Sequence, residues 1–185
     1  IDNWMHSSAK SPFKSGSSRW LLFAGLLAVL TTSTFGSLAD LNLETHDREN
    51  LLDSALISED FTYLLSTAKH HTSGRPLYEL IIWLEYVLWG EDMRYFHLVG
   101  AFWHGTAALL LAALCRRLGW PWGMSGASGL LFLFNVSHFR AVHWVSAQCY
   151  IASFMILCGG LLVYLAWVEE RRVWGQVAFY AALLS

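Results

Sequence analysis

Three carboxylates in residues 40–97 have positions suited to acid–base chemistry: Asp47 and the adjacent pair Glu59 and Asp60. A carboxylate at a membrane surface, held near apolar groups, can have a raised pKa and act as a general base. Residues 40–97 contain eleven acids and four bases, which gives a net charge of −7. The simpler alternative is that these acids are only solvated charges in a loop.

Histidines in or beside apolar runs form the second group of candidates. His97 and His104 are seven residues apart, so they share one face of a helix. His104 lies inside an apolar run, where a polar side chain needs a partner. It either hydrogen-bonds a neighbouring helix or ligates a metal or a tetrapyrrole. Small neighbours would let a helix or a flat cofactor approach, namely Gly100, Ala101, Gly105 and Ala107.

His138, Arg140 and His143 form a third group, after a later apolar run. They either face a water-filled crevice shared with the acidic loop or contact lipid headgroups. His138 and His143 are five residues apart, which is not the spacing of a helical zinc pair, so we predict no metal site. The cysteines lack a CxxC spacing and lie in or beside apolar runs, which is typical of packing rather than of disulfides: Cys115, Cys149 and Cys158.

The composition predicts that apolar helices in a membrane position these groups. Of 185 residues, 55% are hydrophobic and only 14% are charged, against about 25% charged in soluble domains. No Asp, Glu, Lys or Arg occurs in residues 20–39, 98–115, 124–135 or 149–168. A helix that spans a bilayer needs about 20 apolar residues. We therefore predict an all-α, polytopic bundle of about five transmembrane helices, with the lipid bilayer as a partner and no nucleic acid.

The predicted organisation has four parts. Residues 1–19 form a polar cytoplasmic tail, residues 20–39 the first transmembrane helix, residues 40–97 an outer loop, and residues 98–185 transmembrane helices two to five. A cleavable signal peptide is the alternative for the first helix, because Ser37-Leu38-Ala39 is similar to a cleavage site. The chain begins with Ile1 and ends inside the apolar run that starts at Val173, so we expect it to be incomplete.

Two amphipathic helices are expected inside the outer loop. One covers about residues 48–68; the other opens at Pro76, a favoured first helical residue, and ends at Gly90. A helix with one apolar stripe next to a bilayer lies in the interface rather than crossing it. The stripe of the second helix, at spacings of three, four and seven, consists of Leu77, Leu80, Ile81, Leu84, Val87 and Leu88.

The basic residues predict the orientation. Cytoplasmic loops are enriched in Lys and Arg, and three basic clusters fall on one side if every run crosses. This predicts an integral protein of the inner or plasma membrane with a cytoplasmic amino terminus and with residues 40–97 outside. The clusters are Lys10/Lys14/Arg19, Arg116/Arg117 and Arg171/Arg172.

An ordered series of motifs over about residues 59–165 resembles the amino-terminal part of polytopic GT-C-type glycosyltransferases. It is most similar to bacterial protein O-mannosyltransferase-like and tetratricopeptide-linked membrane proteins. The series differs from the family pattern at Asn135-Val136, in place of His-Pro, and at Arg140, in place of Glu. Its pieces are Arg75-Pro76-Leu77, Leu88-Trp89-Gly90, Tyr95-Phe96-His97-Leu98-Val99, His104, Leu131-Phe132, His138 and Ala141-Val142-His143-Trp144-Val145-Ser146-Ala147.

The resemblance implies a first span, a large outer loop with interfacial helices, and then a bundle. It also implies a polyprenyl-phosphate sugar donor and an acid early in the outer loop that serves as catalytic base or metal-linked acid. The best match for that acid is Asp60, with Glu59 in place of the paired aspartate of the family. Asp47 is the second choice, because the family places the acid soon after the first span.

Two functional hypotheses follow, and the sequence leaves open whether the chain is catalytic. In the first, the chain transfers a sugar from a lipid-phosphate donor on the outer face, with Arg75 as a phosphate contact and with His97, His104 and His138 as further substrate-binding residues. In the second, it is a non-catalytic accessory subunit that packs against other membrane subunits or against helices that carry pigment or cofactor. No specific cofactor follows from either hypothesis.

Overall fold

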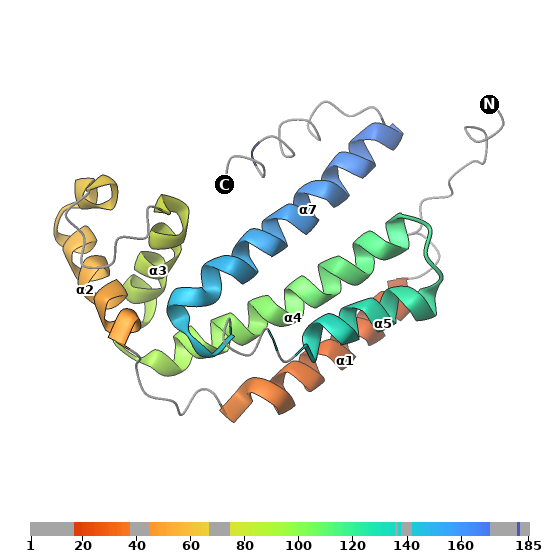
Figure 1. Ribbon diagram of the computed structural model, residues 1–185, viewed down its shortest axis with the longest axis horizontal. Helices are drawn as coiled ribbons and strands as arrows, with labels where there is room; N and C mark the ends of the chain where they lie inside the picture. Colours follow the sequence, from red (N-terminus) through yellow and green to blue (C-terminus); the bar gives the residue numbers. More distant parts are fainter. Residues whose placement is uncertain are drawn as a thin grey trace.

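A computed structural model describes residues 17–37, 45–66, 75–135, 137, 142–170 and 181, and all regular structure in this part of the chain is helical (Figure 1). The prediction of an all-α fold is confirmed. In chain order the elements are α1 (Ser17–Phe35), α2 (Thr45–Glu59), the 3₁₀ helix η3 (Phe61–Leu65), α3 (Pro76–Trp89), α4 (Met93–Arg117), α5 (Trp122–Leu133), the 3₁₀ turn η5 (Val145–Ala147) and α7 (Gln148–Glu170).

The long helix α4 is the centre of the bundle. It packs against α5, α7 and α1, with α7 on one side and α1 and α5 on the other (Figure 1). Three helical segments are long and apolar enough to cross a membrane: Ser17–Phe35, Met93–Arg117 and Val145–Val168. These match the predicted first, second and fourth spans, which supports the prediction of an integral membrane protein.

The other predicted spans have different outcomes. Helix α5 has 12 residues, or about 18 Å of helix, which is less than the hydrocarbon thickness of about 30 Å. It begins at Trp122, directly after Pro121, and ends at Leu133, so the charge-free run of residues 124–135, which the sequence predicted as a span, forms a helix too short to cross the hydrocarbon alone. The predicted fifth span lies outside the described residues, apart from Ala181.

Small residues let the helices of the bundle approach closely. A Cβ placed on Gly129 of α5 would lie 2.8 Å from the carbonyl oxygen of Ala108 of α4. A Cβ on Gly105 of α4 would lie 2.7 Å from Oγ1 of Thr31 of α1. Helices in lipid associate through close packing at small residues, because the surrounding hydrocarbon provides no hydrophobic driving force.

A pair of helices, α2 and α3, lies at one end of the bundle (Figure 1). The predicted helix over residues 48–68 is divided at Asp60, which caps η3 through a bond from the backbone N–H of Thr62. Trp83 of α3 donates from Nε1 to the hydroxyl of Ser58 at 3.1 Å and also contacts the ring of Phe61 edge-on. These contacts hold the end of α2 and η3 against the middle of α3.

Helix α3 begins at Pro76 and ends at Gly90, as the sequence predicted. Gly90 has a φ of 60°, the left-handed conformation that glycine adopts most easily. The predicted apolar stripe of α3 faces largely outward, whereas its buried face carries three polar residues together with Ile82. The buried residues of α3 are Tyr78, Glu79, Ile82 and Glu85. Its exposed large apolar residues are Leu77, Leu84, Val87 and Leu88.

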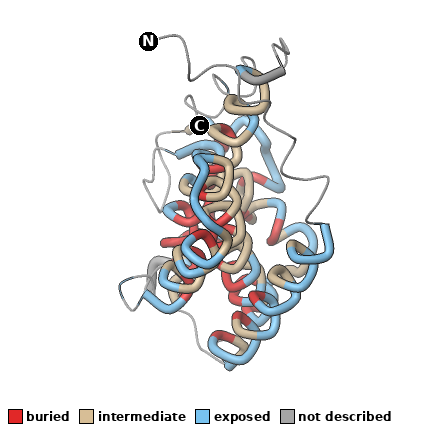
Figure 2. Tube along the Cα trace, turned by 90° about the vertical axis from the view of Figure 1, so that its right-hand side faces the viewer, coloured by how far each residue is buried: buried red, intermediate tan, exposed pale blue. Residues whose placement is uncertain are grey.

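This inverted pattern fits a helix that lies in the lipid interface, as the apolar stripe predicted. Two separate groups of buried apolar residues support the two parts of the molecule, and the buried positions gather toward the middle of the view, with exposed positions around them (Figure 2). One lies in the bundle, around Ala107, Ala108 and Leu133. The other, around Ile82 and Phe96, joins α2 and α3 to the adjacent ends of α4 and α7.

Candidate functional site

The candidate site is a cluster of buried polar side chains where α2 and α3 meet the ends of α4 and α7. We call it the polar cluster, and its members come from four segments that are distant in sequence. Every member is at least partly buried. They are Asp47 and Asn50 of α2, Tyr78 of α3, His97 of α4 and His143 from the segment before η5.

Asp47 is the acid at the centre of the polar cluster. It is 1% exposed, and its Oδ1 accepts a hydrogen bond of 2.9 Å from the backbone N–H of Ser146. Its Oδ2 is buried without a hydrogen-bond partner. The Ser146 bond fixes the orientation of the carboxylate, and Oδ2 is left as an acceptor that a substrate hydroxyl can use.

Tyr78 ties this arrangement together. Its hydroxyl donates to the carbonyl oxygen of Val145 at 2.9 Å and lies 3.4 Å from Nδ2 of Asn50. Burial raises the pKa of Tyr78 well above its usual range, so the hydroxyl keeps its proton and remains a donor. The bond to Val145 holds η5 next to α3, and therefore holds the Ser146 N–H against Asp47.

Two histidines complete the polar cluster. His97 is 1% exposed, and neither of its ring nitrogens has a hydrogen-bond partner. Its ring lies nearly parallel to that of His143, with 6.5 Å between the centroids, and it interacts electrostatically with Asp47 and His143. Among the described residues, no group of three His, Cys, Asp or Glu side chains is arranged to hold a metal ion.

Arg75, at the start of α3, lies against the beginning of α7. Its Nη1 is 2.8 Å from Sγ of Cys149, and its guanidinium lies 5.2 Å from the centroid of the Tyr150 ring. Arg75 and Asp47 both act electrostatically on Tyr78. The structure therefore places the predicted phosphate contact and one predicted acid at the same end of the molecule.

Asp60 and Glu59 lie apart from the polar cluster, in an exposed position at the end of α2. Oδ1 of Asp60 accepts bonds from the hydroxyl of Thr62 at 2.7 Å and from its backbone N–H at 2.9 Å. These bonds hold the pKa of Asp60 below its ordinary value. A carboxylate of this kind is a weaker base than an ordinary one.

His104 is enclosed in the bundle, away from the polar cluster. Its Nε2 lies 3.1 Å from the carbonyl oxygen of Leu133 at the end of α5, so the ring contacts a neighbouring helix as one of the two alternatives predicted. The rings of Phe35 and Phe132 pack against it, with centroids 5.3 and 5.1 Å away. His138 lies outside the described residues.

Glu85 is a buried acid that the sequence did not single out. It is 4% exposed, neither carboxyl oxygen has a partner, and burial raises its pKa to about 8. It lies seven residues after Tyr78, so both share one face of α3. The seven-residue spacing from Tyr78 could have pointed to Glu85 as a buried acid. It does so only once the face of α3 that carries Tyr78 is known to be buried.

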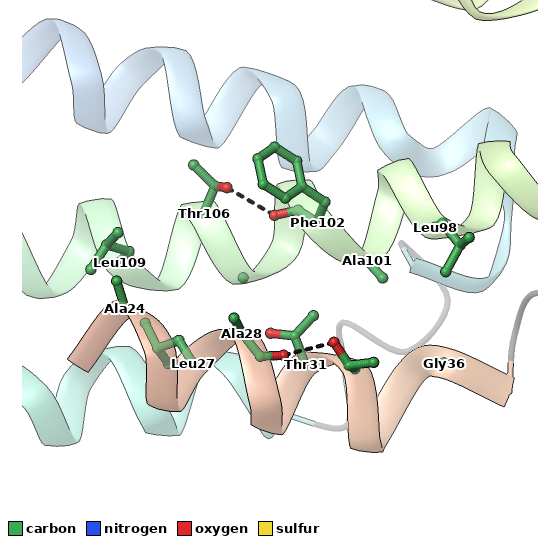
Figure 3. A pocket seen from close by; sticks show the side chains of 12 residues that line it. Ala24, Leu27, Ala28, Thr31, Gly36, Leu98, Ala101, Phe102, Thr106 and Leu109 are labelled. Carbon is green, nitrogen blue, oxygen red and sulfur yellow. Dashed lines mark hydrogen bonds between the residues drawn. The ribbon is translucent and has the colours of Figure 1, made fainter. Parts of the chain in front are cut away.

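A cavity of about 270 Å³ runs between α1 and α4, away from the polar cluster (Figure 3). None of the described residues that line it is charged. Two of its hydroxyls bond within their own helices, Thr32 to the carbonyl of Ala28 and Thr106 to that of Phe102, each at 2.8 Å. The hydroxyl of Thr31, which also lines the cavity, is buried without a hydrogen-bond partner, but the described lining offers no acid or base for catalysis.

Comparison with known proteins gives one partial similarity. The chain is 30% identical over 108 residues to the protein O-mannosyl-transferase tmtc2 of Xenopus laevis. The match covers 58% of this chain and 13% of that protein, so this chain spans about an eighth of its length. No family model matches the chain, and no solved structure matches it.

The similarity points to a glycosyltransferase-like membrane family. It agrees with the resemblance that the motifs indicated, at the coarse level of the transferase class. Chemically, the polar cluster offers a fixed carboxylate with an unpaired, buried acceptor atom and two imidazole rings, and the guanidinium of Arg75 lies at the same end of the molecule. Such a set can accept a proton and bind an anionic group.

Proposed function

We propose that the chain is a membrane glycosyltransferase, or part of one, that uses a polyprenyl-phosphate sugar donor and in which Asp47 is the general base. The observation that carries this proposal is the buried carboxylate of Asp47, with Oδ1 fixed by Ser146 and Oδ2 without a partner. The partial similarity to a protein O-mannosyl-transferase supports mannose as the sugar and a protein hydroxyl as the acceptor.

In the proposed reaction, Oδ2 of Asp47 accepts the proton of the acceptor hydroxyl. The hydroxyl oxygen attacks the anomeric carbon of the donor sugar as the bond from that carbon to the phosphate oxygen breaks. The lipid phosphate leaves as an anion, and Arg75 binds it through its guanidinium. Because Oδ2 is covered, an acceptor reaches it only when the side chains around it move apart, so acceptor binding opens the polar cluster.

Asp47 fits the role of base better than Asp60, although the motif order favours Asp60. Asp60 is exposed, and the hydroxyl and backbone N–H of Thr62 both bond to its Oδ1. Those bonds cap η3, and capping explains the presence of an acid there without catalysis. Asp47 is held instead by a contact with a residue 99 positions away, a contact that local structure does not require.

The test compares Asp47→Asn with Asp60→Asn in the longest natural form of the protein, in membranes supplied with radiolabelled polyprenyl-phosphate mannose and an acceptor protein. Loss of a general base reduces turnover by about 10²–10⁴-fold, and we expect that loss for Asp47→Asn only. Loss of activity in Asp60→Asn with normal turnover in Asp47→Asn would move the base to Asp60. Normal turnover in both variants would reject a catalytic carboxylate in this part of the chain.

A further inference from the structure

A second hollow lies between α1 and α5, at the end of the bundle where α1 begins. It is a groove of about 530 Å³ whose walls are one face of each helix. This groove is separate from the polar cluster, which lies where α4 and α7 begin. Its lining residues are Arg19, Leu22, Phe23 and Leu26 of α1 and Trp122, Gly123, Gly126, Ala127 and Leu130 of α5.

The groove exists because α5 has small residues on the face that it turns to α1. A Cβ on Gly123 would meet no atom within 4 Å, so the space beside it is open. A Cβ on Gly126 would lie 3.6 Å from Cε2 of Phe23, an ordinary contact distance. Larger side chains at these two positions would fill the groove.

The mouth of the groove is positively charged. Arg19 is the only charged residue of α1 and α5, it is exposed, and it makes no ion pair within the described part of the chain. Arg116 and Arg117 lie in the last turn of α4, at the same end of the bundle, because only residues 118–121 separate α4 from α5. The ring of Trp20 packs on that of Trp122, with centroids 4.6 Å apart, beside the mouth.

We propose that this groove binds one acyl chain of an anionic glycerophospholipid, with the lipid phosphate on Arg19. The groove is apolar below its mouth and belongs to helices that hydrocarbon surrounds, so an apolar chain is the occupant that its walls accept. The guanidinium of Arg19, which makes no ion pair with a described residue, attracts an anion, and its planar donors match a phosphate. Basic pockets between transmembrane helices bind anionic headgroups for this reason.

The dimensions fit this occupant. Leu26 is seven positions after Arg19, which is about 10 Å along a helix. One leaflet contributes about half of the 30 Å hydrocarbon core. The groove therefore holds the upper part of one chain while the phosphate stays at the interface. The basic clusters predict that this leaflet is the cytoplasmic one.

Native mass spectrometry of the longest natural form, purified in mild detergent, tests the proposal. The protein is titrated with palmitoyl-oleoyl phosphatidylglycerol or, separately, with palmitoyl-oleoyl phosphatidylcholine. We expect one phosphatidylglycerol to bind more tightly than phosphatidylcholine. Arg19→Gln should weaken phosphatidylglycerol binding about five-fold, the effect of one cation near a membrane surface, and Arg19→Lys should largely keep it.

Two glycine substitutions separate the groove from the rest of the surface. Gly123→Phe fills the groove and should abolish the tight site for phosphatidylglycerol. Gly25→Leu is the matched control, because a Cβ on Gly25 also meets nothing within 4 Å but Gly25 lies outside the groove. Circular dichroism of both variants confirms that the helices remain formed.

Two results would overturn the proposal. One is equal binding of both lipids with no effect of Arg19→Gln. The other is the release of a second protein chain by Gly123→Phe while phosphatidylglycerol binding stays unchanged, which would assign the groove to a partner helix.

Discussion

The bundle and the α2–α3 pair differ in the polar groups that they bury without partners. In the bundle such a group is the neutral hydroxyl of Thr31, whereas the hydroxyls of Thr32 and Thr106 bond to carbonyl oxygens of their own helix. In the α2–α3 pair, Asp47 and Glu85 are buried with carboxyl oxygens that lack partners. The α2–α3 pair therefore retains buried acids, which cost more to bury than a hydroxyl and which a stable fold alone does not require.

The two regions also differ in what covers them. Helix α1 exposes Leu21, Leu22 and Val29 along its length, as a helix in hydrocarbon does. Helix α3 exposes Leu84, Val87 and Leu88 on one side only. The bundle thus offers apolar side chains for lipid contact along the length of α1, and the α2–α3 pair offers them along one face of α3.

The largest effect is expected where the two regions join. Phe96 of α4 is 0% exposed and belongs to the apolar group that holds α2 and α3 on the bundle. Phe96→Ala should cost about 3–5 kcal/mol of stability, because a cavity replaces the ring. Hydrogen exchange of α2 and α3 amides measures the loss.

Phe102→Ala is the control, because Phe102 lies on the same helix and is 68% exposed. We expect little change in exchange for this variant. Equal exchange in the two variants would mean that α2 and α3 do not depend on the packing of Phe96.

The next prediction concerns the pH dependence of stability, which we expect to arise from Glu85 in the α2–α3 pair. Burial raises the pKa of Glu85 from 4.5 to about 8, so the folded protein binds a proton more tightly than the unfolded chain does. The stability that this protonation provides is complete below pH 4.5 and is lost as the pH rises through 8. From the pKa change, wild type should lose up to roughly 4 kcal/mol across that window, and Glu85→Gln should not show this loss.

Thermal unfolding in detergent at pH 5 and pH 9 measures the difference. Glu91→Gln is the matched control, because Glu91 is an exposed acid just after the same helix. A wild-type pH dependence that persists in Glu85→Gln would show that Glu85 is not the group responsible.

The sequence predicted the bundle well because its signal is local. Runs without charge identify spans one at a time, and three of them became helices long enough to cross a membrane. Pro76 and Gly90 likewise mark the ends of α3 by their own backbone preferences. The short length of α5 was harder to predict, because residues 134–136 remain apolar or neutral beyond the point where the helix ends.

The site was less predictable because long-range contacts form it. Asp47 is distinguished by its bond to Ser146, 99 residues away, and no local pattern indicates that pairing. The residues around Asp60 carried a recognisable motif, yet its carboxylate bonds to Thr62 two positions on, a local cap. Helical periodicity showed that α3 has two faces, but it did not show that the polar face is the buried one.

The smallest effect concerns the outer face of α3. If that face lies in the lipid interface, a spin label at position 84 or 88 is accessible to oxygen, which concentrates in lipid, more than to a water-soluble nickel complex. A label at position 91 should show the reverse. Leu88→Ala should weaken the attachment of α3 to bilayers by at most about 1.5 kcal/mol, since the side chain is only partly covered in the interface. Labels at 84 and 88 that are as accessible to nickel as the label at 91 would place the face in water, and the leucines would then need a protein partner to cover them.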